Sequence, residues 1–204
     1  MNFNAEDFIN GFKDGLELML HPKENVGKKM KSTKEALMTY AYFAGIPFLG
    51  YIVLALLLSP LGLSNLRGLG IISIFVIAAF VFFILTPILM YVGALFQHVI
   101  AHDIFKWFEK PFQNTFNATV LAAFPNILLS MFAQVSALGI IAQIASVVWG
   151  VIIYVLALSK QQDVPNGTAI KAMIAGALIM GFISAVLVLS FGSALMSLAG
   201  LATR

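Results

Sequence analysis

Residues 111–159 contain no Asp, Glu, Lys or Arg, although Lys110 precedes this stretch and Lys160 follows it. A bilayer core about 30 Å thick is crossed by roughly 20 apolar residues in a helix, so the stretch is long enough for two crossings joined by a short turn. Unpaired backbone amides are costly in hydrocarbon, which restricts such crossings to helices or closed-barrel strands. Barrel strands alternate strictly over about ten residues, whereas these long apolar runs favour helices. The sequence therefore predicts an all-α membrane protein.

The composition agrees with a chain that is mostly surrounded by lipid. Of the 204 residues, 60% are hydrophobic and 10% are charged, whereas soluble domains are about 25% charged. The absence of Cys excludes a disulfide framework and a thiolate metal site. All nine acidic residues lie before residue 36 or in short loops, and there is no basic stripe of the kind that binds nucleic acid. We therefore expect the lipid bilayer as a partner and no nucleic acid.

Five apolar runs predict a five-transmembrane-helix bundle in a membrane domain of residues 35–204. The spans are placed at about residues 36–58, 69–100, 115–134, 140–158 and 172–200. With five crossings, every basic residue except Arg67 and Arg204 lies on the amino-terminal side. The positive-inside rule then places the amino terminus in the cytoplasm and the carboxyl terminus outside. A second crossing within residues 172–203 is the main alternative. The first span has no signal-peptide cleavage site before it, so we expect it to be an uncleaved anchor.

Residues 1–34 are predicted to form a cytoplasmic amphipathic helix followed by a basic linker. Apolar residues recur every four positions before residue 20, and charged residues occupy the other face. Such a helix lies along the headgroups or packs against the bundle, and the sequence leaves both possibilities open. The lysines before the first span favour cytoplasmic retention and can also bind anionic lipid. The candidate membrane-surface residues are Phe8, Phe12, Leu16, Lys28, Lys29, Lys31 and Lys34.

Prolines and amides inside the predicted spans are candidates for a polar path. A proline frees a helix carbonyl, and a kinked helix either packs against its neighbours or lines a binding site. Intramembrane amides bond between helices or line a path. The prolines are Pro47, Pro87 and Pro125, and the amides are Asn117, Asn126, Gln134 and Gln143. No predicted span contains an ionised residue, which disfavours an ion-coupled pump and leaves a passive path open.

Small residues repeat every four positions in the first and last spans. This spacing lets two helix backbones approach closely, within one chain or between two copies in a homo-oligomer. The candidate helix-packing residues are Ala41, Gly45, Ala177, Gly181 and Ala185.

One cluster could bind a metal ion. His98 and His102 are four residues apart on one helix face, and Asp103 follows, so the two rings could ligate zinc. The Glu that follows the first His in zinc proteases is missing, and histidines at the end of a span commonly lie at the interface. The chain also lacks a nucleophile elbow and a phosphate-binding glycine loop. We therefore predict a non-enzymatic protein without a cofactor and keep a metal-dependent enzyme at these residues as the weaker alternative.

Two short segments resemble Yip-type (Ypt/Rab-interacting protein) integral membrane domains. The first is Leu18-Met19-Leu20-His21-Pro22-Lys23-Glu24, which precedes the basic linker. The second is Ala122-Ala123-Phe124-Pro125, followed by Val147-Val148-Trp149-Gly150-Val151 in the next span. The Asp-Leu-Tyr-Gly-Pro motif of eukaryotic members is absent, so small-GTPase binding is not expected. The resemblance, to the prokaryotic branch, implies a five-helix membrane protein with a cytoplasmic amino-terminal region. It implies membrane-trafficking or membrane-organising roles for the eukaryotic members, and largely undefined functions for the prokaryotic ones. We expect the protein in a prokaryotic plasma membrane.

The sequence therefore favours two functions. The first is a non-enzymatic multi-pass membrane protein that organises membrane or recruits other membrane proteins through protein and lipid contacts. The second is a passive transporter or channel with a polar path near Pro47, Pro87, Pro125, Asn126 and Gln143. A hollow, amide-lined interior would favour the second function, and a filled apolar interior would oppose it.

Overall fold

The computed structural model describes residues 4–27, 30–58, 70–132 and 135–183, and this part of the chain is helical without a β-strand. The predicted all-α class is thereby confirmed. The elements are α1 (Ala5–Leu20), α2 (Pro22–Asn25), α3 (Thr33–Leu58), α4 (Ile71–Phe80), η1 (Val81–Leu85), α5 (Thr86–His98), η2 (Val99–Ile104), α6 (Phe112–Ser130) and α7 (Ser136–Gln162). A further helix, Asn166–Ile183, follows α7.

Four helices in the described ranges are long and apolar enough to cross a membrane, which indicates an integral membrane protein. They are Thr33–Leu58, Ile72–Ile104, Leu138–Gln162 and Asn166–Ile183. The predicted span at residues 115–134 falls on α6, which is not among the four because polar side chains such as Gln113, Asn114 and Asn117 lower its hydropathy. The count of five crossings therefore stays a prediction.

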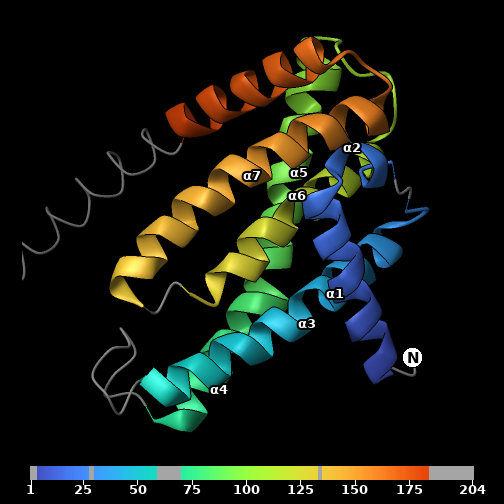
Figure 1. Ribbon diagram of the computed structural model, residues 1–204. Coiled ribbons are helices and arrows are strands. Elements are labelled where there is room, and N and C mark those ends of the chain that lie inside the picture. The colour runs from blue at the N-terminus through green and yellow to red at the C-terminus, as the bar shows by residue number, and fades with distance from the viewer. Residues whose placement is uncertain (1–3, 28–29, 59–69, 133–134, 184–204) are drawn as a thin grey trace, which may run out of the picture.

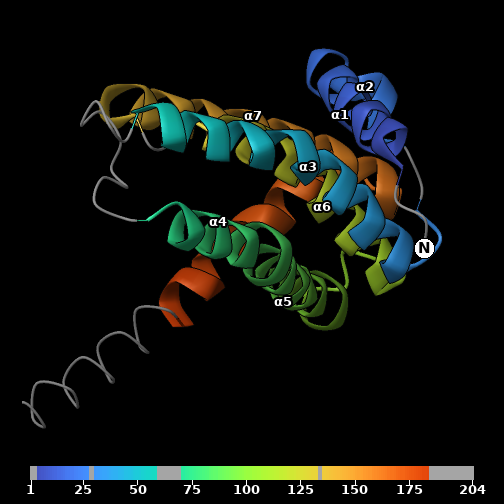
Figure 2. The same ribbon diagram turned by 90° about the horizontal axis from the view of Figure 1, so that it is seen from below.

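The helix α6 lies at the centre of the described bundle. It contacts α1, α3, α5 and α7, and it runs antiparallel to α7, to which it is joined by a short connection (Figure 1). Viewed from below, α3, α6 and α7 lie together, while α4 and α5 lie on one side of them and α1 on the other (Figure 2). The core gathers aromatic and branched side chains, including Phe43, Phe116, Leu121, Phe124 and Ile153, all of which are fully buried. These side chains form a buried apolar core.

The helix α1 crosses the outside of α3 and α6 at three glycines. A Cβ atom on Gly11 would collide with Tyr42, one on Gly15 with the Phe124 ring, and one on Gly45 with the Phe8 ring. The absence of a side chain at each position lets the helix backbones approach closely, as small residues do at other helix contacts. This packing fixes α1 against the side of the bundle.

The second apolar segment is one long helix that contains two π-helical stretches, η1 and η2. The stretch η1 ends directly before Thr86 and Pro87. Proline has no N–H to donate, so nearby carbonyls must find other donors. The Thr86 hydroxyl donates to the Val81 carbonyl at 2.8 Å, and the Tyr40 hydroxyl of α3 donates to the Phe82 carbonyl at 2.6 Å. These bonds satisfy the irregular backbone inside the bundle.

Candidate functional site

A buried polar network, centred on the Thr115 hydroxyl, joins three helices near the first residues of α6. Gln162 of α7 donates to Thr115 Oγ1 at 2.8 Å, and His98 Nδ1 of α5 lies 3.0 Å from the same oxygen. All three side chains are buried. Buried polar groups are costly unless they are hydrogen-bonded, so these bonds specify how α5, α6 and α7 meet. We call this cluster the Thr115 network.

The linker between α2 and α3 is bonded to the bundle through its backbone. The Asn117 amide donates to the Met30 carbonyl at 2.9 Å, and Gln161 donates to the Val26 carbonyl at 3.3 Å. Gln113 in turn donates to Asn117 Oδ1 at 2.6 Å. Two buried amides thus depend on carbonyls of the amino-terminal segment, which makes this segment part of the membrane body's structure.

The two histidines of the candidate metal site stack on each other. Their ring centroids are 4.8 Å apart, with planes inclined by 20°. His98 is bonded to Thr115, and His102 Nδ1 lies 2.8 Å from Asp103 Oδ1. Stacked rings direct their nitrogen lone pairs along parallel planes rather than toward one point. Over the described ranges, no group of three or more His, Cys, Asp or Glu residues is placed to hold a metal ion.

An amide-lined cleft of about 510 Å³ opens between α5, α6, α7 and the Asn166–Ile183 helix. Met90 of α5 and Met173 lie on its two sides, and Asn126 and Gln143 both line it. Both amides are exposed, so the cleft is open to the surroundings of the bundle. Two of the residues predicted for a polar path therefore meet in one place.

The three prolines predicted for that path do not line this cleft. Pro47 and Pro125 are buried within α3 and α6, and Pro87 begins α5 beside η1. Their positions agree with kinks that pack against neighbouring helices. The amide of Gln134 lies outside the described residues.

The predicted small-residue faces have different surroundings. Gly45 is buried beneath Phe8, and Ala41 is half-buried on the same helix. Ala177 and Gly181 are exposed, and a Cβ atom on Gly181 would meet nothing within 4 Å. Ala185 lies outside the described residues. Only the first of the two faces contacts another helix in the part of the chain described.

The candidate membrane-surface residues are divided between contacts with the protein and exposure. Phe8 packs edge-on against Tyr42 at 5.5 Å, and Phe12 packs against Phe124 at 6.1 Å. Leu16 is half-buried against the core. Among the lysines, Lys31 and Lys34 are exposed, whereas Lys28 and Lys29 lie outside the described residues. The apolar face of α1 is therefore directed at α3 and α6, which is the packed arrangement of the two that the sequence left open.

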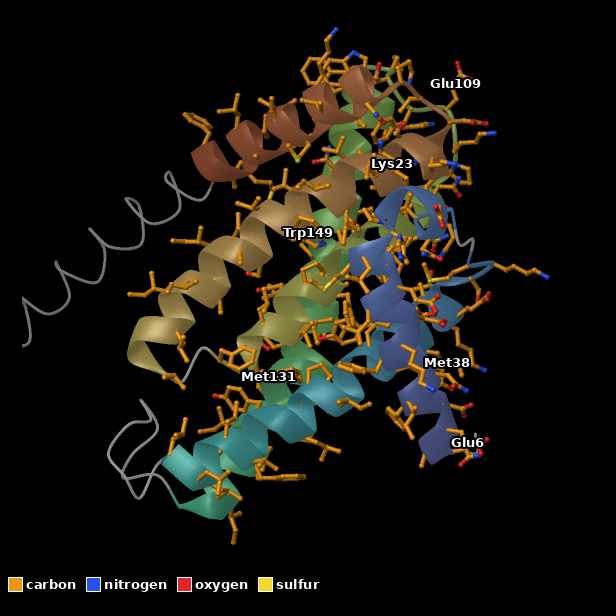
Figure 3. The ribbon with its side chains drawn as sticks, viewed as in Figure 1. Glu6, Lys23, Met38, Glu109, Met131 and Trp149 are labelled. Carbon is orange, nitrogen blue, oxygen red and sulfur yellow. The ribbon has the colours of Figure 1, made fainter. Side chains whose placement is uncertain are left out.

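Several important residues were missed in the sequence analysis. Thr115, Gln161 and Gln162 were not singled out, because polar residues beside a loop usually face water. Trp149, which the sequence singled out only through the Yip-type resemblance, donates its indole N–H to the Met19 carbonyl at 3.1 Å and so connects α7 to α1 (Figure 3). Gln97 donates to the Ala172 carbonyl at 2.7 Å. A cluster of amides at the ends of three apolar runs is the one sequence signal that could have indicated this network.

No family model, curated protein or solved structure matches the chain. The resemblance to Yip-type domains therefore stays a prediction.

Proposed function

We propose that this protein is a non-enzymatic multi-pass membrane protein that organises the bilayer around it and recruits partners through the surface of α1. The resemblance to Yip-type domains implies a membrane-organising role only for the eukaryotic members. The observation that carries the proposal is the position of α1, which is docked on the sides of α3 and α6 through Gly11 and Gly15. In this proposal α1 lies on the cytoplasmic side, because the lysines of the linker adjoin it.

The docked helix marks the level of the lipid headgroups. Its outward side exposes Glu6, Asp14 and Glu17, and Figure 3 shows Glu6 directed away from the bundle. Ionised side chains are expensive in hydrocarbon, so α1 must lie at or above the membrane interface. Trp149, which contacts the last turn of α1, is of the residue type enriched at this level.

The described parts of α3 and α7 are short beyond that level. From Gly45 to Leu58 in α3, and from Trp149 back to Ser136 in α7, the rise is only about 20 Å at 1.5 Å per residue. The hydrocarbon core of a bilayer is about 30 Å thick. A bilayer accommodates a short hydrophobic body by thinning around it. Local thinning would sort lipids and neighbouring proteins, which is a physical basis for organising membrane without catalysis.

The helix α6 is the fifth membrane segment in this proposal, and it lies beside α7, which is one of the four helices apolar enough to span. Its Phe124 packs against Gly15 of α1 at the proposed headgroup level, so the residues before Phe124 lie on the cytoplasmic side and those after it enter the bilayer beside α7. The polar side chains of its first turns therefore stay out of the hydrocarbon, where an unpaired amide would be costly.

The thinning is tested by the protein's preference for lipids of different chain length. The full chain is reconstituted with phosphatidylcholines, and relative binding of short-chain and long-chain brominated lipids is measured by tryptophan quenching. We expect stronger binding of the shorter chains. Replacing Gly11 and Gly15 by Leu displaces α1 and moves the optimum to longer chains. Gly27→Leu is the matched control, since nothing lies within 4 Å of a Cβ there.

A native protein that binds the longest chains best would contradict the proposal. If the double variant does not fold, as judged by circular dichroism, the preference of the native chain still decides.

Recruitment is tested on the exposed apolar residues of α1. Ile9 is 47% exposed and Leu20 is 73% exposed, and both can be changed to Ser without disturbing the packed face. We expect the double variant to lose self-association or partner labelling in cell membranes, measured by proximity biotinylation. Ile170→Ser on the Asn166–Ile183 helix serves as the control. Point variants are preferable to deleting residues 1–34, because deletion would leave Asn117 and Gln161 without their linker carbonyls. Unchanged labelling in the α1 variant would contradict the proposal.

The amide-lined cleft favours a second candidate, the passive path. Asn126 and Gln143 meet in the cleft, as a polar path requires. Stopped-flow light scattering on vesicles with the reconstituted chain measures its water permeability. A permeability that falls when both amides are changed to Leu would support the path, and a permeability no higher than that of protein-free vesicles would remove it.

A further inference from the structure

The cleft extends from the interface into the depth of the membrane. Trp149 contacts α1 at the proposed headgroup level. Gln143 lies six residues before it on α7, about 9 Å deeper at the rise of an α-helix. Tyr154 and Thr119 line the opposite end of the cleft. The lining therefore has the Tyr154 and Thr119 hydroxyls at the shallow end, and the two amides with the Ser146 hydroxyl at the deep end.

The two amides at the deep end have hydrogen-bonding capacity to spare. Asn126 Oδ1 accepts from the Ser146 hydroxyl at 3.4 Å, which is a long bond. Among residues of the described ranges, neither the Asn126 nitrogen nor the Gln143 side chain has a hydrogen-bond partner. An amide without a partner in hydrocarbon costs several kcal/mol. An occupant of the cleft that presents oxygen acceptors would remove this cost.

The chemistry of the lining restricts the occupant. None of the residues that line the cleft is charged, so a phosphate group would find no cation to pair with it. Apolar side chains such as Met90, Val147 and Met173 form much of the wall, which fits a molecule that reaches the cleft from within the bilayer. A volume of about 510 Å³ is within the usual range of small-molecule sites. It would hold a glycerol ester group and only the first part of each acyl chain.

We propose that the cleft binds the glycerol-ester end of a diacylglycerol. The ester carbonyls accept hydrogen bonds from Asn126 and Gln143, and the free hydroxyl lies just above them, on the headgroup side of the cleft. The acyl chains leave the cleft sideways and continue in the bilayer. The site is independent of the surface of α1, and it adds a defined lipid ligand to a protein proposed to act on its membrane.

The test uses the full chain in phosphatidylcholine vesicles that contain a photoactivatable diacylglycerol with a diazirine beside the glycerol. We expect cross-links on the cleft-lining parts of α6 and α7, competed by unlabelled diacylglycerol and located by mass spectrometry. Changing Asn126 and Gln143 to Leu removes two hydrogen bonds and should lower the labelling about tenfold. Ser73→Leu is the matched control, since it replaces an exposed polar residue of α4 away from the cleft.

A further variant and a second lipid probe also test the proposal. Gly150 lines the cleft, so Gly150→Leu should block labelling while both amides remain. A diazirine-bearing phosphatidylcholine at the same concentration should label the cleft weakly, because its phosphate has no partner there. Equal labelling by the two lipids, or labelling that all variants retain, would overturn the proposal. So would a cleft that holds only water, shown by raised water permeability without any lipid cross-link.

Discussion

The helices α6 and α4 combine burial and polarity in the reverse of the way a soluble protein would. The enclosed helix contains polar residues, and the exposed helix is apolar. The most enclosed helix, α6, contains buried Thr115 and Asn117 among its aromatic residues. In α4, which is far more apolar, Ile72, Phe75 and Val76 are each at least half exposed. In water, exposure favours polar residues, whereas in a bilayer the exposed face must suit lipid. Apolarity therefore reports contact with lipid in this chain, and enclosure by other helices is what permits amides.

The contacts of the two helices explain the difference. Four elements surround α6, so its amides bond to the linker, to α7 and to one another. In the segment from Ile72 to Ile104, only 17% of the residues in its most apolar 18-residue stretch are buried. It is joined to α3 by a few specific contacts, such as the Tyr40 hydroxyl to the Phe82 carbonyl. The comparison implies that α6 depends on its partners for membrane insertion and that the α4–α5 segment does not.

Insertion of the isolated segments should show the largest effect. Residues 72–104 fused into a carrier protein should insert in nearly all chains, whereas residues 112–130 alone should insert poorly because their amides would face lipid. We expect the insertion equilibrium constants to differ by more than about tenfold, measured from glycosylation of flanking acceptor sites. Extending the second segment through α7, to residue 162, should restore insertion. Efficient insertion of residues 112–130 alone would break the comparison.

Truncating a large aromatic residue in each helix should show the next largest effect. Phe124 of α6 is fully buried against Phe12 and Phe43, so Phe124→Ala should lower the free energy of unfolding by about 3–4 kcal/mol through the cavity it leaves. Phe80 of α4 is 51% exposed, and Phe80→Ala should cost much less because lipid fills the space. Thermal unfolding in detergent, followed by size-exclusion chromatography, compares the two. Equal destabilisation would show that α4 is enclosed by protein as α6 is.

The sequence could predict the helical class and the position of the apolar helices, because runs of about 20 apolar residues have few other solutions in a membrane. It could not predict that α6 would be the centre. Hydropathy sums over residues and does not show which neighbour covers Asn117 or Thr115. The docking of α1 was only partly visible. Gly11 and Gly15 are four residues apart, the spacing of small residues at helix contacts, but the sequence does not show that they lie opposite Tyr42 and Phe124.

The residues of the candidate site could also be predicted only in part. Asn126 and Gln143 could be singled out as amides in apolar runs, and the structure places both at one cleft. Gln161 and Gln162 could not, because they adjoin a charged loop and resemble residues that face water. Their burial follows from the linker and α6 folding over them. Long-range packing, which composition does not encode, decides which amides are enclosed.

Removing the central amide of α6 should give a smaller loss than the aromatic truncation. Asn117→Leu leaves the buried Met30 carbonyl and the Gln113 nitrogen without their partner. We expect a loss of about 2 kcal/mol in unfolding free energy, since an unsatisfied buried group costs about 1–3 kcal/mol. Ser73→Leu makes the same kind of change on exposed α4 and should be neutral or slightly stabilising. The comparison would fail if Asn117→Leu were as well tolerated as Ser73→Leu.

The smallest expected effect concerns the histidine pair, where enclosed and exposed groups lie side by side. His98 is 8% exposed and bonded to Thr115, whereas His102 is on the open side of the stack beside Asp103. His98→Leu should cost about 1 kcal/mol, the worth of one net hydrogen bond, while His102→Leu should cost less because water replaces its partner. Unfolding in detergent at neutral pH measures both. A larger loss for His102→Leu would mean that the exposed ring makes contacts stronger than its stack on His98 and its bond to Asp103. Burial would then not determine which histidine contributes more to the free energy of unfolding.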